Sequence, residues 1–319
     1  MLTSVGKILL GAGALLLAFV AFQLWGTSLY TNHEQGHLRE ALGKVIGHTS
    51  LPLAALGKQT HPGSDPAGSS LPTVATSVAA TTSAPAVGQP IGLLAIPKLG
   101  LDDAIVEGVG EAQLQGGPGH YPGTSLPGQA GNAAIAGHRT TFAAPFYNLN
   151  QLEAGDPIFV LTSQGLFRYD VERTEIVPPD DNTVLDASTT PELTLTTCNP
   201  RYSASQRLVV VAFLDTTPAA KPHTGNPSTT KPAPKPTAKK STGGAGASLA
   251  AATTSNSGDI LPAVLWGLVT LIGFVLLRFG SRRLKRPLTW VSYVVGVPVL
   301  LAALFFCFEH VSLALPASF

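Results

Sequence analysis

Cys198 and Arg207 stand where two neighbouring apolar runs end and begin. The first run alternates apolar positions at Leu193 and Leu195, a period of two that indicates a half-buried strand. The same period places Cys198 on the face opposite the leucines. Pro200 ends this strand because proline has no N–H to donate to a ladder. The sequence therefore predicts a thiol and a guanidinium at the ends of adjacent strands.

The two cysteines of the chain differ in setting. Cys307 lies inside the last apolar run, where a small buried hydrophobic residue is expected. Cys198 has no evident partner. Outside the cytoplasm a single thiol is usually paired or lost unless its reactivity is used. A catalytic role for Cys198 is favoured over a structural buried cysteine.

A cysteine nucleophile reacts as its thiolate, so it needs a base or a cation nearby and an acid for a leaving amine. Of the eight histidines, only His120 and His138 fall between residues 91 and 215. His138 ends the apolar run of residues 132–137, so a strand would hold it rigidly. His120 sits among glycine and proline in a predicted loop. We therefore expect His138 to be the catalytic histidine.

Arg207 could bind a phosphate or carboxylate, form a surface ion pair, or stabilise an oxyanion. Its proximity to Cys198 favours the oxyanion role. Arg139 and Arg201, each close to a candidate catalytic residue, are rivals for it. No group of histidine, cysteine and carboxylate residues has metal-ligand spacing, and no phosphate loop is present. The sequence predicts neither a metal nor a cofactor.

Residues 91–215 have the pattern of one β domain. Short apolar runs recur there between glycine and proline turns, which predicts an all-β fold closed into a barrel. Short helical turns are expected near 111–115 and 145–149. With charged residues at 12% and a net charge of +1, the chain carries no overall basic field for nucleic acid. The expected strands cover residues 91–96, 104–106, 133–136, 158–161, 167–177, 193–197 and 208–214.

Three long apolar runs, at residues 8–25, 260–277 and 288–308, predict three transmembrane helices. The short loop between the last two holds five arginine and lysine residues, so it is expected in the cytoplasm and residues 26–259 outside. The first run could be a cleaved signal peptide, but an uncleaved anchor is favoured. The localisation expected is a multi-pass cell-membrane protein with an extracellular catalytic domain.

The tracts at residues 51–89 and 216–258 are rich in proline, serine, threonine, alanine and glycine, which is typical of flexible linkers. Lysines in the second tract fit a solvated linker or a loose attraction to an anionic wall polymer. The predicted organisation is an anchor at 1–26, a stalk and linker at 27–90, the barrel at 91–215, a linker at 216–259, a transmembrane helix at 260–279, a basic loop at 280–287, a transmembrane helix at 288–309 and a tail at 310–319.

These residues resemble the sortase family. Thr194-Leu195-Thr196-Thr197-Cys198 with Arg207 is similar to the TLxTC signature that an arginine follows, and residues 137–141 resemble the histidine segment. The histidine and cysteine segments are most similar to those of class E sortases. Further similar stretches are residues 96–99, 117–124 and 155–156.

The resemblance implies a sortase-like β-barrel and transpeptidation on the outer face of a Gram-positive membrane. Cys198 would attack the threonine carbonyl of an LAxTG or LPxTG sorting signal. His138 would protonate the departing glycine amine, and Arg207 would hold the oxyanion. By similarity, Thr197 would assist the oxyanion and Tyr121 would line the peptide pocket. The implied partners are secreted proteins with a C-terminal sorting signal and a peptidoglycan precursor as acceptor.

Three alternatives stay open. A class C-like sortase would polymerise pilin subunits, although no acidic-aromatic lid segment precedes the barrel. A papain-like wall hydrolase normally has its cysteine before its histidine, whereas His138 precedes Cys198. A membrane-tethered cell-wall scaffold without catalysis would not need all three catalytic residue types.

Overall fold

The computed structural model describes residues 2–57, 74–75, 77–216, 260–283 and 286–314. The chain divides into two compact units. One comprises residues 31–252, and the other combines residues 1–30 with residues 253–318.

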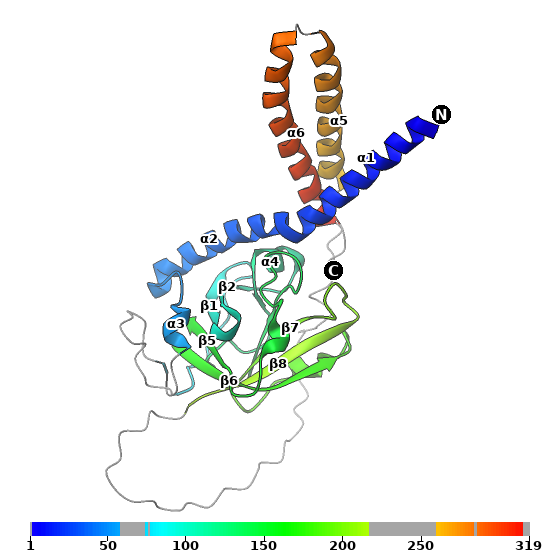
Figure 1. Ribbon diagram of the computed structural model, residues 1–319. Helices are drawn as coiled ribbons and strands as arrows, with labels where there is room; N and C mark the ends of the chain where they lie inside the picture. Colours follow the sequence, from blue (N-terminus) through cyan, green and yellow to red (C-terminus); the bar gives the residue numbers. More distant parts are fainter. Residues whose placement is uncertain (1, 58–73, 76, 217–259, 284–285, 315–319) are drawn as a thin grey trace, which may run out of the picture. The chain divides into compact units, whose positions relative to one another are not determined.

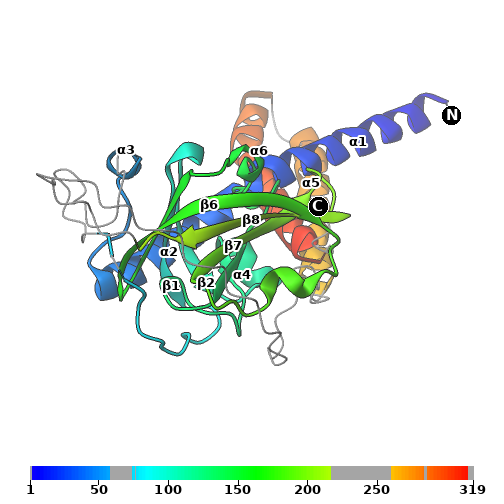
Figure 2. The same ribbon diagram turned by 90° about the horizontal axis from the view of Figure 1, so that it is seen from below.

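Eight strands of the first unit close into a barrel in the order β1-β2-β3-β4-β7-β8-β6-β5 (Figures 1 and 2). Most neighbours are antiparallel, and the parallel pairs are β2 with β3 and β4 with β7. Closure leaves no long unpaired sheet edge. The strands are β1 (Pro90–Ile96), β2 (Leu101–Glu107), β3 (Gly119–His120), β4 (Asn132–Ala136), β5 (Pro157–Thr162), β6 (Gly165–Val177), β7 (Glu192–Asn199) and β8 (Gln206–Leu214).

The closed all-β barrel predicted from the sequence is confirmed, and each expected strand is present. The strand that the sequence did not predict is β3, which has two residues and therefore no readable alternation. Helix α4 (Glu111–Gly116) forms at an expected helical turn, while the 3-10 turn η3 (Leu149–Gln151) begins where the second was expected to end. Two other 3-10 turns, η2 (Pro97–Leu99) and η4 (Asn182–Leu185), join strands.

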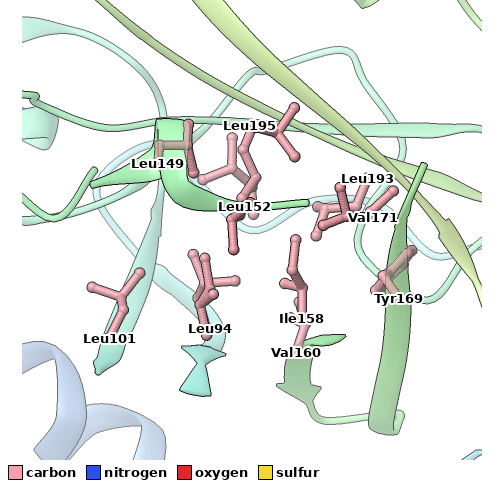
Figure 3. Packing of buried hydrophobic residues seen from close by; sticks show 14 of the residues in the cluster. Leu94, Leu101, Leu149, Leu152, Ile158, Val160, Tyr169, Val171, Leu193 and Leu195 are labelled. Atoms are coloured by element: carbon pink, nitrogen blue, oxygen red, sulfur yellow. The ribbon is translucent and has the colours of Figure 1, made fainter. Parts of the chain in front are cut away.

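The barrel interior is an apolar cluster to which every strand except β3 contributes buried residues (Figure 3). On β7 the inward residues are Leu193 and Leu195, both without exposed surface. They pack with Leu94 of β1 and Ile158 of β5. Burying one such side chain contributes about 1.5–3 kcal/mol. Thr194 and Thr196, which alternate with the leucines, consequently face the other side of the sheet.

The described part of the predicted stalk and linker packs on the barrel. From helix α2 (Thr27–Ile46), Gln35 donates to the Ala104 and Gly116 carbonyls at 3.0 and 2.9 Å and accepts from the Ala104 N–H at 2.8 Å. Leu56 of the short helix α3 (Leu53–Leu56) is fully buried beside β1 and β5. Gln35 thus supplies hydrogen bonds at a position on β2 that β3 is too short to reach.

The second unit is helical. Helices α5 (Ile260–Arg283) and α6 (Arg286–Ala314) form a hairpin (Figure 1), and Trp266 stacks on Phe306 with ring centres 5.0 Å apart. Helix α1 (Leu2–Ala21) continues into the π-helical turn η1 (Phe22–Gly26). Cys307 is half-buried on α6, with its thiol 3.7 Å from the Ala263 carbonyl.

Over the residues that the structure describes, no helix is both long enough and apolar enough to span a membrane. The three spans predicted from the sequence are therefore not confirmed. Most of the linker expected at residues 216–259, and residues 284–285 of the basic loop, lie outside the described residues.

Candidate active site

Strands β7 and β8 place Cys198 directly opposite Arg207. The two residues are cross-strand partners in the antiparallel ladder, so their side chains project from the same face of the sheet. Strand alternation puts Thr196 on that face as well, away from the leucines of the core. Arg207 is only 3% exposed, whereas Cys198 is half-buried. The predicted neighbourhood of thiol and guanidinium is present in the fold.

The surroundings of Cys198 favour the neutral thiol. Burial raises the pKa of the Cys198 thiol above its ordinary value, and the positive charges of Arg207 and Arg139 oppose that shift. Two guanidinium groups therefore do not by themselves produce a resident thiolate. A base must take the proton when the reaction begins.

His138 reaches this region through the parallel pairing of β4 with β7. Ala136 is the register partner of Thr196, and the Gly137 N–H donates to the Thr196 carbonyl at 3.1 Å. Continuing this register by two residues brings His138 level with Cys198. The chain then turns sharply, because Phe142, Ala143 and Ala144 all have positive φ, at 51, 60 and 47°. Such left-handed residues cost energy and are concentrated at functional sites.

The imidazole of His138 is poorly solvated. Its Nε2 is buried without a hydrogen-bond partner among the described residues, and its ring lies 5.0 Å from that of Phe142. Thr141 Oγ1 is 3.5 Å from Nδ1, a long contact. Desolvation lowers the pKa of His138 to about 4. At neutral pH, the site thus holds a neutral imidazole and a neutral thiol.

The three candidate arginines have different surroundings. Arg207 donates through Nη1 to the carbonyls of Ala204 and Gln206, both at 3.0 Å, which fixes the plane of its guanidinium. Arg139 donates to the Cys198 carbonyl at 3.0 Å. Arg201 donates to a loop carbonyl and lies 4.2 Å over the ring of Tyr147. Among the three, Arg207 is the cross-strand partner of the thiol, and Arg139 supports the thiol's backbone.

Tyr121 belongs to the same face. It is 1% exposed, and its hydroxyl is 3.1 Å from Thr196 Oγ1. Burial raises the pKa of Tyr121 to about 12, and the hydrogen bond with Thr196 and the positive charge of Arg207 oppose this rise. The pKa of Tyr121 also responds to the charge of Cys198. Tyr121 therefore lies within electrostatic reach of both β-strand residues of the site.

The hydroxyl of Thr197 is already engaged. It donates to the Gly137 carbonyl at 2.7 Å and is buried. The bond ties β7 to the residue that precedes His138. The contact positions the histidine segment, and the help of Thr197 to an oxyanion stays a prediction.

His120 occupies a different place from the predicted loop. It lies in β3 without exposed surface, and its Nδ1 is 2.7 Å from the Glu107 carboxylate. Glu107 was not singled out by the sequence, since an acidic residue after the run 104–106 reads as an ordinary strand end. Within the part of the chain that the structure describes, no three histidine, cysteine or carboxylate side chains form a group that could hold a metal ion.

A closed barrel that carries a thiol opposite a guanidinium, with an imidazole two residues beyond the end of the adjoining strand β4, is chemically equipped for cysteine-dependent acyl transfer. The Sortase domain family model matches residues 94–215. A relative named Sortase SrtE1 from Streptomyces coelicolor is 30% identical over 225 residues, which cover 65% of this chain and 55% of the relative. Sortase D from Bacillus subtilis is 38% identical over 117 residues, which cover 36% of this chain and 58% of that protein.

This chain belongs to the sortase family. A solved structure of sortase E1 from Streptomyces coelicolor, with a tripeptide in its active site, is 34% identical; the match covers 42% of this chain and 91% of that one, with a TM-score of 0.38. The chain spans little more than half the length of the two curated relatives.

Proposed function

We propose that this protein is a cysteine transpeptidase that cleaves a sorting signal of the LAxTG or LPxTG type between threonine and glycine. It would then join the released protein to an amine of the cell wall. The observation that carries the proposal is the cross-strand pair of Cys198 and Arg207. Membership of the sortase family supports the reaction class. The similarity of the histidine and cysteine segments to class E sortases favours alanine at the second signal position.

In the first half-reaction the Cys198 thiolate forms a bond to the threonine carbonyl carbon, and the carbonyl electrons move to oxygen. Arg207 stabilises that oxyanion. When the carbonyl re-forms, the C–N bond breaks and the His138 imidazolium protonates the departing glycine nitrogen. A thioester is left. In the second half-reaction an amine attacks the thioester and passes a proton to His138, and the Cys198 thiolate departs.

The resting protonation states explain why the reactive pair is scarce. The pKa of His138 is about 4, and that of Cys198 lies above its ordinary value. Because the imidazole is the weaker base and the thiol the weaker acid, the thiolate–imidazolium pair is the minor form before substrate binds. Mutual attraction of the two charges increases its population. Substrate binding must therefore favour the charged pair.

The proposed location is the outer face of a cell membrane, with the chain anchored by three helices. The proposal rests on the three long apolar runs and on five basic residues in the short loop between the last two. The proposed partners are secreted proteins bearing the signal and a peptidoglycan precursor that supplies the amine.

The test is intact-mass spectrometry of the purified chain mixed with LAxTG and LPxTG peptides. We expect a mass increase equal to the acyl fragment ending in threonine, located on the peptide that contains Cys198. Cys307→Ala is the matched control, because it removes the other thiol and should leave the adduct unchanged. The proposal would be contradicted if neither peptide formed an adduct, or if the adduct lay on Cys307.

A further inference from the structure

Glu107 and His120 form a buried hydrogen-bonded pair of titratable side chains that the proposed reaction does not use. Glu107 ends β2 and is 2% exposed, while His120 in β3 has no exposed surface. Their side chains meet at 2.7 Å across the short parallel pairing of these strands. Such pairs are costly to desolvate and are strongly destabilised when one partner is removed.

The hydrogen bonds of His120 fix where its protons lie. Its Nε2 is 2.9 Å from the Ser125 carbonyl, which can only accept, so Nε2 carries a proton and donates it. Its Nδ1 and the Glu107 carboxylate then share a second proton between them. Thr124 Oγ1 lies 3.0 Å from Nε2 as well. The ring is thereby locked in one orientation by contacts at both nitrogens.

Thr124, which contacts the His120 ring, also contacts the backbone of Tyr121. The hydroxyl of Thr124 donates to the Tyr121 carbonyl at 2.8 Å, and the Tyr121 N–H donates to the Ala134 carbonyl at 2.9 Å. The turn of residues 121–125 is therefore closed around the His120 ring. At its start, the Tyr121 hydroxyl rests 3.1 Å from Thr196, two residues before Cys198.

We infer that Glu107 and His120 act together as positioning residues, holding the turn of residues 121–125 so that the Tyr121 side chain stays beside the nucleophile's strand. The inference rests on the proposed function, because it assigns Tyr121 to the peptide-binding face. In this arrangement the pair acts through Tyr121, whose hydroxyl contacts Thr196 of β7. Its loss should consequently affect peptide turnover through the same step as loss of the tyrosine hydroxyl.

A double-mutant cycle tests this coupling in the full chain. The variants are Glu107→Gln, Tyr121→Phe and the two combined, and the measurement is kcat/KM with a fluorescence-quenched LAxTG peptide. Glutamine keeps the shape of the carboxylate and removes its charge. We expect each single change to lower kcat/KM about tenfold, the effect of losing one hydrogen bond worth about 1.4 kcal/mol. The double variant should be no slower than the slower single variant.

Val160→Ala is the control for stability alone. It truncates a core residue of β5, a strand that pairs with neither β3, β4 nor β7. It should lower the melting temperature and leave kcat/KM unchanged at a temperature well below melting. If Glu107→Gln does not fold, His120→Gln takes its place in the cycle.

The outcomes are distinguishable. Full activity of Glu107→Gln, or effects of the two single changes that multiply in the double variant, would overturn the inference while the wild type still forms its adduct. A wild type that forms no adduct would instead refute the proposed function. Coupling between the two positions, with Val160→Ala unaffected in rate, would support the positioning role.

Discussion

Replacing Arg207 by lysine is the sharpest test of how the site stabilises charge. Arginine and lysine carry the same charge, so the change removes the geometry of the donors and keeps the electrostatic attraction. In the structure Nη1 of Arg207 is committed to the carbonyls of Ala204 and Gln206. The remaining N–H groups of the guanidinium are left for a substrate. A lysine has a single nitrogen, which will satisfy those two carbonyls first.

The expected loss follows from the oxyanion role. Removing one preorganised donor from an oxyanion site costs about 2.7–4 kcal/mol, and the retained positive charge moderates the loss. We expect Arg207→Lys to lose roughly 2–4 kcal/mol of transition-state stabilisation, about 30- to 1000-fold in kcat/KM. The pH dependence should be unchanged, because both side chains stay protonated over the working range.

The assay is kcat/KM for peptide cleavage across pH, together with a melting curve for each variant. Arg201→Lys is the matched control, since Arg201 contacts Tyr147 and not the thiol's cross-strand position. The control should retain wild-type turnover within about twofold, which is the free-energy scale of a surface contact. If Arg207→Lys is nearly fully active while Arg201→Lys is inactive, the oxyanion has been assigned to the wrong arginine.

Other predictions follow from the same geometry. Cys198→Ala should abolish the covalent adduct with a melting temperature close to wild type, since the half-buried thiol lies outside the apolar core; turnover near wild type would refute the covalent mechanism. The pH–rate profile of the wild type should be a broad bell, with an acidic limb near pH 4 from His138 and a basic limb above the ordinary thiol range; one limb centred near pH 6.5 would show that His138 is solvated. Burial raises the pKa of Asp103 to about 6, so its ionisation destabilises the fold as pH rises from about 4 through 6. Asp103→Asn should therefore stabilise the chain by on the order of 2 kcal/mol at pH 8 and little at pH 4, measured by urea unfolding. Equal effects at the two pH values would contradict this reasoning. Reporter fusions after Leu214 should be extracytoplasmic and fusions at Ser281 cytoplasmic, and the reverse would refute the proposed topology.

The sequence was sufficient to predict the barrel and the proximity of Cys198 and Arg207 on two neighbouring strands. Alternation at Leu193 and Leu195 determined which face Cys198 occupies, because successive side chains of a strand point to opposite sides. Arg207 follows Cys198 by nine positions with Pro200 between them, a spacing that lets the second strand return antiparallel to the first. The other long strands could be predicted from the sequence because each carries a recognisable apolar run between turn residues. The two-residue strand β3 could not be predicted in this way. It is a strand only because it pairs with β2 and β4, and two residues are too few to show an alternating pattern.

The tertiary structure decided which residues far apart in the chain come into contact. Sequence order left three arginines beside the candidate catalytic residues, and only the register of β7 with β8 distinguishes Arg207 from Arg139 and Arg201. His120 appeared to be a loop residue until closure of the barrel buried it against Glu107, 13 positions earlier in the chain. The pKa shift of His138 likewise has no local signature, because desolvation is produced by the segments that pack around the ring.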